Sequence, residues 1–562
     1  MNTRRFLVFI LVVMVVIGSA CQPAASPSDS IKIGESLGGN HGQTQPKPES
    51  VENPASVESP SGEPSTTENK QDGGPTRIDN APSPQPTQAY QPEIMEGEYY
   101  SEESFPYWDN QFDDYGVNPF VATKQDHLST FALDVDTGSY SVMRRYLSEG
   151  SLPPFDAVRV EEFVNYFDPG YEPPADEGFA IYADGALNPF SYEQTYLIRY
   201  GIQGYEVSER NRKPANLTFV IDISGSMDME NRLGLVKRSL EYLVEQLRAD
   251  DQVAIVVFGS RARVHLHPTR GDQKRQILSA IRQLRTGGST NAEAGLTMGY
   301  RTALSMFETK SVNRVILCSD GVANVGMTGP EGILSQVQDY VDEGVYLTTV
   351  GFGMGNFNDT LMEQLADQGD GFYAYVDDLD EAKKMFVDEI TSTLQVIARD
   401  AKVQVDFNPD VVEAYRLVGY ENRDVADEDF RNDTVDAGEI GAGHHVVALY
   451  EVTLYPGAEG RISTVQLRWE SPDTSRVTET NGNFNTWDLS EHFEETSPYY
   501  QLSVIVMQYA EILRESPWAW DVSIGDLSKM AGRIRKNFRF DADVLEFIDL
   551  INSAERIMDH GW

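Results

Sequence analysis

The chain has 562 residues, enough for roughly three or four domains at about 150 residues each, and 40% of them are hydrophobic, so a buried core can form. The 88 acidic residues outnumber the 45 basic ones and give a formal net charge of −43, which argues against a nucleic-acid partner and against electrostatic attachment to anionic lipid. Two cysteines are too few for a disulfide scaffold or for a cysteine-based zinc or iron–sulfur centre.

Residues 1–21 have the order of a secretory signal: two arginines, an apolar run over residues 6–17, small residues and then Cys21. The apolar run is shorter than the ~20 residues that a membrane-spanning helix needs. A cysteine directly after small residues resembles a bacterial lipoprotein signal, although Gly18 stands where that family usually has Leu. The resemblance implies a lipid anchor on Cys21 and an exported, membrane-anchored location in the bacterial cell envelope. Plain secretion and an uncleaved anchor remain open.

Residues 22–95 are rich in Pro, Ser, Glu, Gln and Thr and hold few large aliphatic residues. Such a segment cannot bury enough apolar surface to offset the entropy of ordering, so the sequence predicts a disordered tether. Folded structure is expected from residue 96. Region 96–178 is predicted to hold a short strand and two helices, from Ser139 and over 157–167, and region 179–214 alternates apolar and polar residues as strands do.

Residues 215–398 alternate between apolar strands and helices, which predicts a doubly wound, mostly parallel sheet covered on both faces, an α/β fold of Rossmann-like type. Helices are expected at 232–247, 273–284, 292–307, 332–342, 357–367 and 379–397. Region 399–562 returns to antiparallel β alternation up to about residue 470 and ends in helices near 499–514, 524–534 and 541–558. We expect strands 179–214 and 401–470 to form one β-sandwich-like unit into which the α/β domain is inserted.

The informative motif follows the first strand of the α/β domain, as Asp222-Ile-Ser224-Gly-Ser226. Ligands bind beyond the carboxyl ends of strands in such sheets, and oxygen side chains at positions i, i+2 and i+4 of one loop can converge. Thr290 and Asp320 are expected on later loops at the same edge. Hard oxygen ligands suit Mg²⁺ best here, with Mn²⁺ or Ca²⁺ as alternatives. The competing interpretation is a turn and helix cap without an ion.

The order DxSGS, GGST and SDG resembles the von Willebrand factor type A domain and its metal-ion-dependent adhesion site. This resemblance implies that Ser224, Ser226 and Thr290 ligate the ion and that Asp222 and Asp320 hold it directly or through water. Gly295 has the spacing after Thr290 that the family shows. The remaining coordination position usually takes an acidic residue from a protein partner.

Residues 128–168 resemble the N-terminal region of YfbK-like bacterial lipoproteins, and residues 406–423 with 442–455 resemble their C-terminal region, so that the resemblance covers about residues 100–562. We therefore expect a cell-envelope protein that binds an acidic protein partner through a divalent cation and is not an enzyme. A structural or complex-assembly protein whose metal site is not essential, and a metal-dependent hydrolase, are the alternatives.

Other motifs are given structural interpretations. Asp134-Val-Asp136-Thr137 superficially matches the DxDxT motif of haloacid-dehalogenase-type phosphatases, but the repeated β–α units that this chemistry needs do not follow, so we expect a strand-end turn and a helix cap, with a second ion site left open. The histidine pairs 265/267 and 444/445 are expected at the surface, and Cys318 in the core. The PWAWD segment, 517–521, is expected to be packing, with a carbohydrate platform as the alternative.

Overall fold

The computed structural model describes residues 110–560, apart from 176–177, 322–331, 334–336, 339, 342, 356, 390–393 and 436. The predicted signal peptide, Cys21 and the tether lie outside the described residues, and the helix expected at 332–342 lies partly outside them. Residues 99–562 belong to one compact unit. In the described part of the chain, no helix is both long and apolar enough to cross a bilayer.

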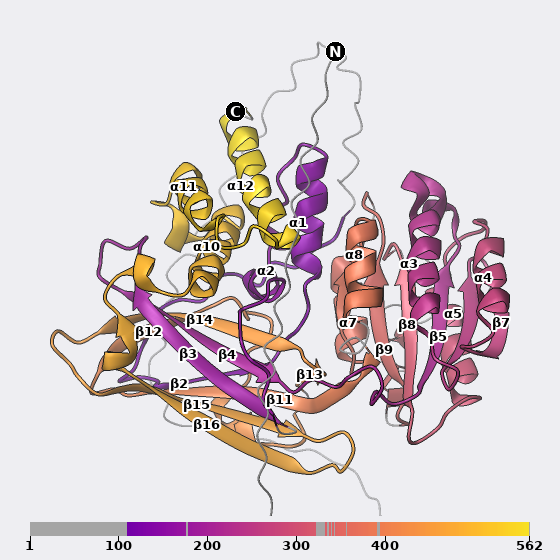
Figure 1. The fold of residues 1–562 in the computed structure, drawn as a ribbon, viewed down its shortest axis with the longest axis horizontal. Helices are drawn as coiled ribbons and strands as arrows, with labels where there is room; N and C mark the ends of the chain where they lie inside the picture. Colours follow the sequence, from indigo (N-terminus) through magenta and orange to yellow (C-terminus); the bar gives the residue numbers. More distant parts are fainter. Residues whose placement is uncertain are drawn as a thin grey trace, which may run out of the picture. The chain divides into compact units, whose positions relative to one another are not determined.

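A six-stranded sheet forms the centre of the α/β domain (Figure 1). Its strands are β5 (Ala215–Asp222), β6 (Gln252–Phe258), β7 (Arg263–Arg270), β8 (Val312–Ser319), β9 (Tyr346–Gly351) and β10 (Tyr373–Tyr375). They lie in the order β10-β9-β8-β5-β6-β7, and neighbours are parallel except β6 and β7. Every residue of β5 is buried, which explains its continuous apolar sequence, because helices cover both faces.

Two apolar cores lie on opposite faces of this sheet. Helices α3 (Arg232–Gln246), α4 (Lys274–Gln283) and α8 (Leu379–Lys383), with the π-helical turn η3 (Lys384–Asp388), cover one face. Helices α5 (Ala292–Leu304) and α7 (Asp359–Asp367) cover the other. Phe219 and Ile221 point into the first core and Val220 into the second, the alternation expected along a strand.

Two further sheets, one of six strands and one of five, pack face to face outside the α/β domain. The first has the order β1-β12-β14-β4-β3-β17, and the second has the order β13-β11-β15-β16 with β2 beside β11. The strands of the first are β1 (Val121–Ala122), β3 (Phe179–Leu187), β4 (Tyr196–Gly204), β12 (Val412–Val418), β14 (His445–Leu454) and β17 (Leu489–Ser490). Those of the second are β2 (Leu128–Ala132), β11 (Val396–Phe407), β13 (Gly438–Gly441), β15 (Arg461–Glu470) and β16 (Val477–Asn485).

The six-stranded sheet of this sandwich is assembled from both sides of the α/β domain. Strand β4, before the domain, pairs antiparallel with β14, after it, over eight residue pairs from His445–Gln203 to Val452–Tyr196. Ile198 and Tyr200 of β4 face the five-stranded sheet, while Leu197 faces a layer of helices. The chain enters and leaves the α/β domain at one place, where the Lys213 backbone N–H donates to Gln395 Oε1 at 3.0 Å.

The helix layer on the sandwich combines both ends of the described chain (Figure 1). Its members are α1 (Gly138–Ser148), α2 (Val160–Asn165), α10 (Pro498–Leu513), α11 (Ile524–Ile534) and α12 (Ala542–His560). Short 3-10 turns connect the elements at η1 (Phe155–Ala157), η2 (Gly225–Asn231), η4 (Asp427–Arg431), η5 (Thr486–Asp488), η6 (Phe493–Glu495) and η7 (Pro517–Ala519). Val142 and Tyr146 of α1 also reach the α/β domain, where they join the core beside α5 and α7.

Two expected helices are shorter than the sequence pattern suggested. The expected helix 157–167 is split into η1 and α2, because an extended backbone at Val158 and Arg159 separates them. The expected helix 379–397 forms α8 and η3, and its last two residues already belong to β11, which begins at Val396. Over such a short apolar run the helical and strand patterns cannot be told apart, so the sequence predicts the end of this helix too far along the chain.

Candidate metal centre

The first strand of the α/β domain delivers Asp222 to the carboxyl edge of the sheet, where the side chain is buried. Its Oδ1 accepts a hydrogen bond from the Ser224 backbone N–H at 2.7 Å, and its Oδ2 accepts one from Ser319 Oγ at 3.1 Å. The carboxylate is thus fixed from two sides, by its own loop and by the end of the neighbouring strand β8.

The two serines of the motif lie together on the turn that follows β5. Ser224 is buried, Ser226 is partly exposed, and their Oγ atoms are 3.0 Å apart. The turn continues as η2 and leads directly into α3. Both hydroxyls therefore lie next to Asp222, as the i, i+2, i+4 spacing predicted.

The loop that carries Thr290 is held against this turn by backbone hydrogen bonds. The Gly225 N–H donates to the Gly288 carbonyl at 3.1 Å, and the Gly287 N–H donates to the Ile223 carbonyl at 2.7 Å. Gly288 has a φ of +102°, and a Cβ there would lie 2.8 Å from Ser260 Oγ, so the close contact needs glycine. Thr290 is buried, and the next residue, Asn291, caps α5 by accepting from the Ala294 N–H.

Helix α5 approaches the sheet closely because it carries glycine where it crosses β6 and β5. A Cβ on Gly295 would lie 2.6 Å from Phe258 Cδ1, and one on Gly299 would lie 2.3 Å from Val220 Cγ2. The spacing of Gly295 after Thr290 thus has a packing reason. It lets the helix that begins beside Thr290 lie flat on the sheet.

Asp320 follows β8 and is fully buried, and its Oδ2 accepts a hydrogen bond from Arg232 Nη1 at 2.8 Å. Arg232, at the start of α3, also donates to the Met354 carbonyl. Burial, followed by repulsion from Asp320, raises the pKa of Asp222 to about 7. Asp222 and Asp320 are therefore two buried carboxylates that interact. Arg232, paired with Asp320, supplies one positive charge beside them.

The donor set suits a hard divalent cation. Two carboxylates and three hydroxyls offer oxygen ligands only, and burial disfavours the charged carboxylates unless a positive charge offsets them. Arg232 offsets one of the two. Across the described residues, no group of three or more His, Cys, Asp or Glu side chains could hold a metal, so hydroxyls are essential to any ion bound here.

Arg232 and Ser319 hydrogen-bond the two predicted aspartates, and the sequence motifs do not predict either contact. Ser319 stands beside Asp320 in the SDG motif, so its position was a usable signal. Arg232 carries no such signal, because a basic residue at the start of a helix is commonly a solvated one. Its ion pair with Asp320 depends on α3 and β8 being neighbours in the fold.

The DxDxT segment forms a turn whose two aspartates pair with Arg423. Asp134 Oδ1 accepts from the Asp136 N–H at 2.8 Å, a strand-end turn, and Arg423 pairs with both aspartates at 3.0 and 3.5 Å. Thr137 is the residue before α1, but its side chain makes no capping hydrogen bond. The expected turn is therefore present, while the expected side-chain cap is wrong.

The histidine expectation needs correction for one pair. His267 is exposed and His265 is partly exposed, but His444 and His445 are partly buried along a cavity of about 950 Å³. Burial lowers the pKa of His444 to about 3 and that of His445 to about 4. His445 begins β14, and its Nε2 lies 3.2 Å from the Asn165 carbonyl oxygen, a tertiary contact that the sequence does not reveal.

Cys318 is buried in β8, as expected. In the PWAWD segment, Trp518 packs against the body: its Nε1 donates to the Asn118 carbonyl at 3.3 Å, and the Arg416 guanidinium lies 5.2 Å from its ring centroid. Trp518 is nevertheless 43% exposed, and Trp520 is 77% exposed. The segment thus combines packing contacts with two solvent-exposed rings.

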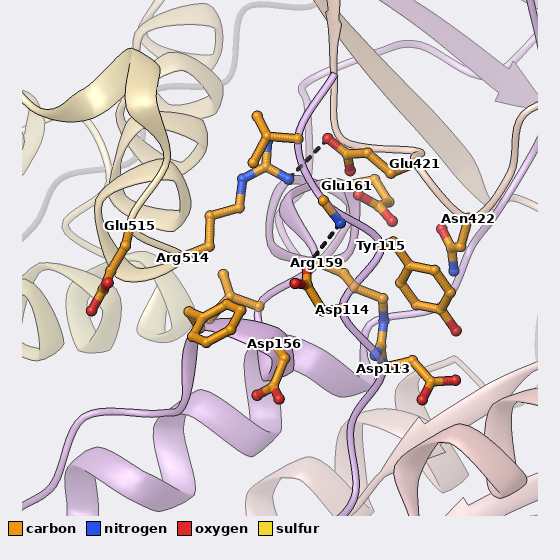
Figure 2. A pocket seen from close by; sticks show the side chains of 14 residues that line it. Asp113, Asp114, Tyr115, Asp156, Arg159, Glu161, Glu421, Asn422, Arg514 and Glu515 are labelled. Atoms are coloured by element: carbon orange, nitrogen blue, oxygen red, sulfur yellow. Dashed lines mark hydrogen bonds and ion pairs between the residues drawn. The ribbon is translucent and has the colours of Figure 1, made fainter. Parts of the chain in front are cut away.

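A cavity of about 310 Å³ lies between residues 113–117, α2 and the end of α10 (Figure 2). Carboxylates dominate its wall, and Arg514 Nη1 donates to Glu421 Oε1 at 3.0 Å across it. Arg159 also lines the cavity, and its Nη1 donates to Asp359 Oδ2 of α7 at 2.7 Å. The five predicted ion ligands are not among its lining residues, so it is separate from the candidate metal centre.

Three family models match successive regions of the chain. Residues 107–199 match the model described as "von Willebrand factor", residues 216–388 match "von Willebrand factor type A domain", and residues 392–557 match "Uncharacterized protein YfbK, C-terminal". The second match coincides with the α/β domain, and the third begins at the strand that leaves it.

Among curated relatives, YfbK of Escherichia coli (strain K12) is 43% identical over 352 residues, which cover 61% of this chain and 60% of the relative. The Synechocystis protein sll0103 is 27% identical over 274 residues, or 47% of this chain and 64% of the relative. The chain thus spans less than two thirds of the length of either. Human inter-alpha-trypsin inhibitor heavy chain H3 is 29% identical over 192 residues, covering 32% of this chain and 21% of that protein.

Among solved structures, a von Willebrand factor type A protein from Catenulispora acidiphila is 15% identical, with a TM-score of 0.40 over 64% of this chain and 87% of that one. The strand order, the helices on both faces and the family-model match over residues 216–388 agree with one another. The α/β domain of this chain has the von Willebrand factor type A fold, within a chain that is similar to YfbK.

Proposed function

We propose that this chain binds a protein partner through a divalent cation held by Asp222, Ser224, Ser226, Thr290 and Asp320. The observation that carries the proposal is that the turn after β5 is hydrogen-bonded to the loop that carries Thr290, and that Asp222 and Asp320 are buried at the ends of the neighbouring strands β5 and β8. That fold family suggests a protein-interaction role. Mg²⁺ is the expected ion, with Mn²⁺ and Ca²⁺ as alternatives.

The residues around the site have two roles: some would hold the ion, and others orient the two carboxylates. The three hydroxyls would ligate the ion, and Asp222 and Asp320 would hold it directly or through water. When bound, the ion supplies a positive centre to which a partner's carboxylate can add. Ser319 fixes the Asp222 carboxylate, and Arg232 fixes that of Asp320, so both acids are oriented before binding. Such preorganisation lowers the entropy lost on association.

We propose binding and not catalysis. The turn 223–231 and the loop 285–291 carry no histidine, lysine, cysteine or tyrosine, and their carboxylates are Asp228 and Glu230. A metal-dependent hydrolase would have to use one of these carboxylates, or a metal-bound water, as its base or nucleophile. A structural envelope protein would keep its role when the ion site is removed, so dependence on the ion separates the three functions.

We further propose that the chain is exported and anchored to the bacterial cell envelope through a lipid on Cys21. The order of charged, apolar and small residues before this cysteine supports the anchor. The variant Cys21→Ser should leave the membrane fraction or accumulate as an unprocessed precursor. Unchanged membrane association, or failure of the wild type to incorporate a lipid analogue, would contradict the anchor.

The functional test is capture of a partner from a membrane extract, with Mg²⁺ and with a chelator. Wild type should retain a specific protein only with Mg²⁺, and Asp222→Ala should retain none. Asp272→Ala is the matched control, since Asp272 is an exposed aspartate just past the far end of β7, near where β6 begins. A partner that binds wild type equally in chelator would contradict the ion's role, and hydrolysis of the partner would favour the enzyme alternative.

A further inference from the structure

Three arginines lie on the segments that border the candidate metal centre. Arg261 follows Ser260, whose Oγ accepts from the Ser289 N–H at 3.0 Å, and Ser289 adjoins Thr290. Arg263 begins β7 and pairs with Val257, which in turn pairs with Ile221, the residue before Asp222. Arg285 lies two residues before Gly287, which is bonded to the turn after Asp222. We call these three residues the arginine rim.

The arginine rim is exposed, and none of its members has a carboxylate within ion-pair distance among the described residues. Arg285 donates only to the carbonyls of Arg282 and Leu284, at the end of α4. The exposed carboxylate described on the bordering segments is Asp228, which accepts from Thr286 Oγ1 at 3.1 Å. Among the side chains that the structure describes, the rim therefore faces solvent without an ion-pair partner.

This positive charge contrasts with the rest of the molecule. The chain has a net charge of −43, yet basic residues outnumber acidic ones between residues 251 and 301. The excess affects a neighbouring group: burial and then repulsion from Arg285 lower the pKa of Lys237, whose Nζ donates to the Leu284 carbonyl at 2.7 Å. Positive potential thus accumulates beside an ion site whose expected ligand is a carboxylate.

We propose that the partner segment bound at the metal centre is acidic over several residues, with one carboxylate on the ion and others paired with Arg261, Arg263 and Arg285. The inference rests on the proposed function. Arg263 lies two strand spacings from β5, roughly 10 Å. An extended segment covers that distance in about three residues, at about 3.3 Å each. The partner's other acids should therefore lie within about three positions of the ligating one.

The test uses the full chain and two fluorescent peptides, hexaglutamate and a hexapeptide of glycine and serine with one glutamate, with binding followed by anisotropy. In Mn²⁺ or Mg²⁺, hexaglutamate should bind tighter than the single-glutamate peptide, and added salt should reduce the difference. The triple variant R261Q/R263Q/R285Q should lose about tenfold in hexaglutamate affinity, as expected for three exposed ion pairs. Its affinity for the single-glutamate peptide should change little.

The matched control is R275Q/R301Q/K310Q, which removes the same charge from exposed positions of the same domain away from the arginine rim. Arg275 follows Arg270, which pairs with Gln252 at the start of β6, and Lys310 precedes the start of β8. The control should keep wild-type affinity for hexaglutamate. An equal loss of hexaglutamate affinity in both triple variants would overturn the role of the arginine rim, because the overall positive charge of the domain would then explain the binding.

Failure of the rim and failure of the ion site give different results. If both peptides bind equally and only with the cation, the ion site stands and the acidic-segment inference is overturned. If hexaglutamate binds equally in chelator and to Asp222→Ala, but not to the rim variant, the rim stands and the ion's role is contradicted. If neither peptide binds under any condition, both are overturned. Tighter binding of heparin than of hexaglutamate in chelator would assign the rim to an anionic polysaccharide and overturn the proposal.

Discussion

Asp320 lies at the candidate metal centre and pairs with one neighbouring arginine, Arg232. It is buried, and its ion pair with Arg232 is also buried. Removing one partner from such a pair leaves an uncompensated charge, which commonly costs about 3–5 kcal/mol. A divalent cation at the site would offset the same charge. Arg232 and the ion are therefore expected to stabilise the same carboxylates by different means.

Arg232→Met should lower the free energy of unfolding by about 3 kcal/mol in chelator and by clearly less in Mg²⁺. Urea unfolding under both conditions measures the difference. Arg212→Met is the matched control, because Arg212 forms a buried pair with Asp251 at 2.7 Å near the opposite end of β6. The control should lose the same stability with and without Mg²⁺. An equal loss in both conditions for Arg232→Met would contradict the shared role.

Among the residues of the candidate metal centre, those in short motifs are predictable from the sequence. Those brought together only by tertiary packing are not. Asp222, Ser224 and Ser226 are neighbours in one turn, so their spacing alone places them together. Thr290 and Asp320 required the strand order and the resemblance to a known domain. Arg232 meets Asp320 only through packing of α3 beside β8, and no local pattern announces such a contact.

Helices α2 and α7 meet through a cluster of buried charges. Arg159 pairs with Glu162 of α2 and with Asp359 of α7, and Arg423 pairs with Glu363 at 3.3 Å. Carboxylates outnumber arginines here. Burial raises the pKa of Glu363 to about 7 and that of Glu162 to about 8, in spite of the adjacent arginines. The interface between the two helices is therefore expected to hold protons near neutral pH.

Glu161, the neighbour of Glu162 on α2, tests whether a buried carboxylate here holds a proton near neutral pH. Burial and then repulsion from Glu421 raise its pKa to about 7, and its Oε2 accepts from the Tyr420 N–H at 3.0 Å. Because the folded state holds this proton more tightly than the unfolded state, stability should fall as pH rises from about 4.5 to 7. Glu161→Gln keeps the acceptor and removes the titration. It should match wild type at pH 5 and exceed it by roughly 1–3 kcal/mol at pH 8.

Urea unfolding at both pH values measures this effect, with Glu459→Gln, an exposed glutamate, as the control. The control should differ from wild type by the same small amount at pH 5 and pH 8. If Glu161→Gln were less stable than wild type at pH 8, the ionised carboxylate would be stabilising. The direction of the pKa shift would then be wrong.

Helices and strands with a strong hydrophobic pattern are predictable from the sequence. Strands that form only because an adjacent strand pairs with them are not. The expected helix 524–534 coincides with α11, and the buried strands of the α/β domain were evident from continuous apolar runs. Strand β16 was missed because its sequence, VTETNGNFN, is mostly polar. It forms because β15 offers a complete pairing edge over nine residue pairs. The sequence predicts strand only from residue 401, whereas β11 begins at Val396, because its first residues also fit a helical pattern.

The described part of the chain is a β-sandwich, with its layer of helices, into which an α/β domain is inserted. Strands β4 and β14 pair across the insertion, and the Lys213–Gln395 hydrogen bond closes its base. The predicted α/β fold is confirmed, and the structure also pairs the strands that flank the domain. The contact that sequence reasoning did not anticipate is α1, which packs Val142 and Tyr146 onto the domain. Their spacing fits any buried helix face, so the partner was not evident.

Fragments should reflect this architecture. Residues 215–397 should fold alone, with reduced stability because the apolar cover from α1 is lost. Residues 401–562 should be poorly ordered, since they lack β4 and the helices α1 and α2 of their core. Circular dichroism melts and proton–nitrogen correlation spectra measure both. A cooperative melt and dispersed spectrum from 401–562 would contradict the shared sandwich.

The central claim, an ion bound at the carboxyl edge of β5, is tested most directly by thermal melts of wild type and Asp222→Ala in chelator and in Mg²⁺. Wild type should gain about 2.7 kcal/mol at an ion concentration 100 times the Kd. The variant should gain nothing, and its stability in chelator should change little or rise, because repulsion with Asp320 is relieved. A wild type without an ion-dependent shift, and without binding by calorimetry, would contradict the account and leave the motif as a turn that caps a helix.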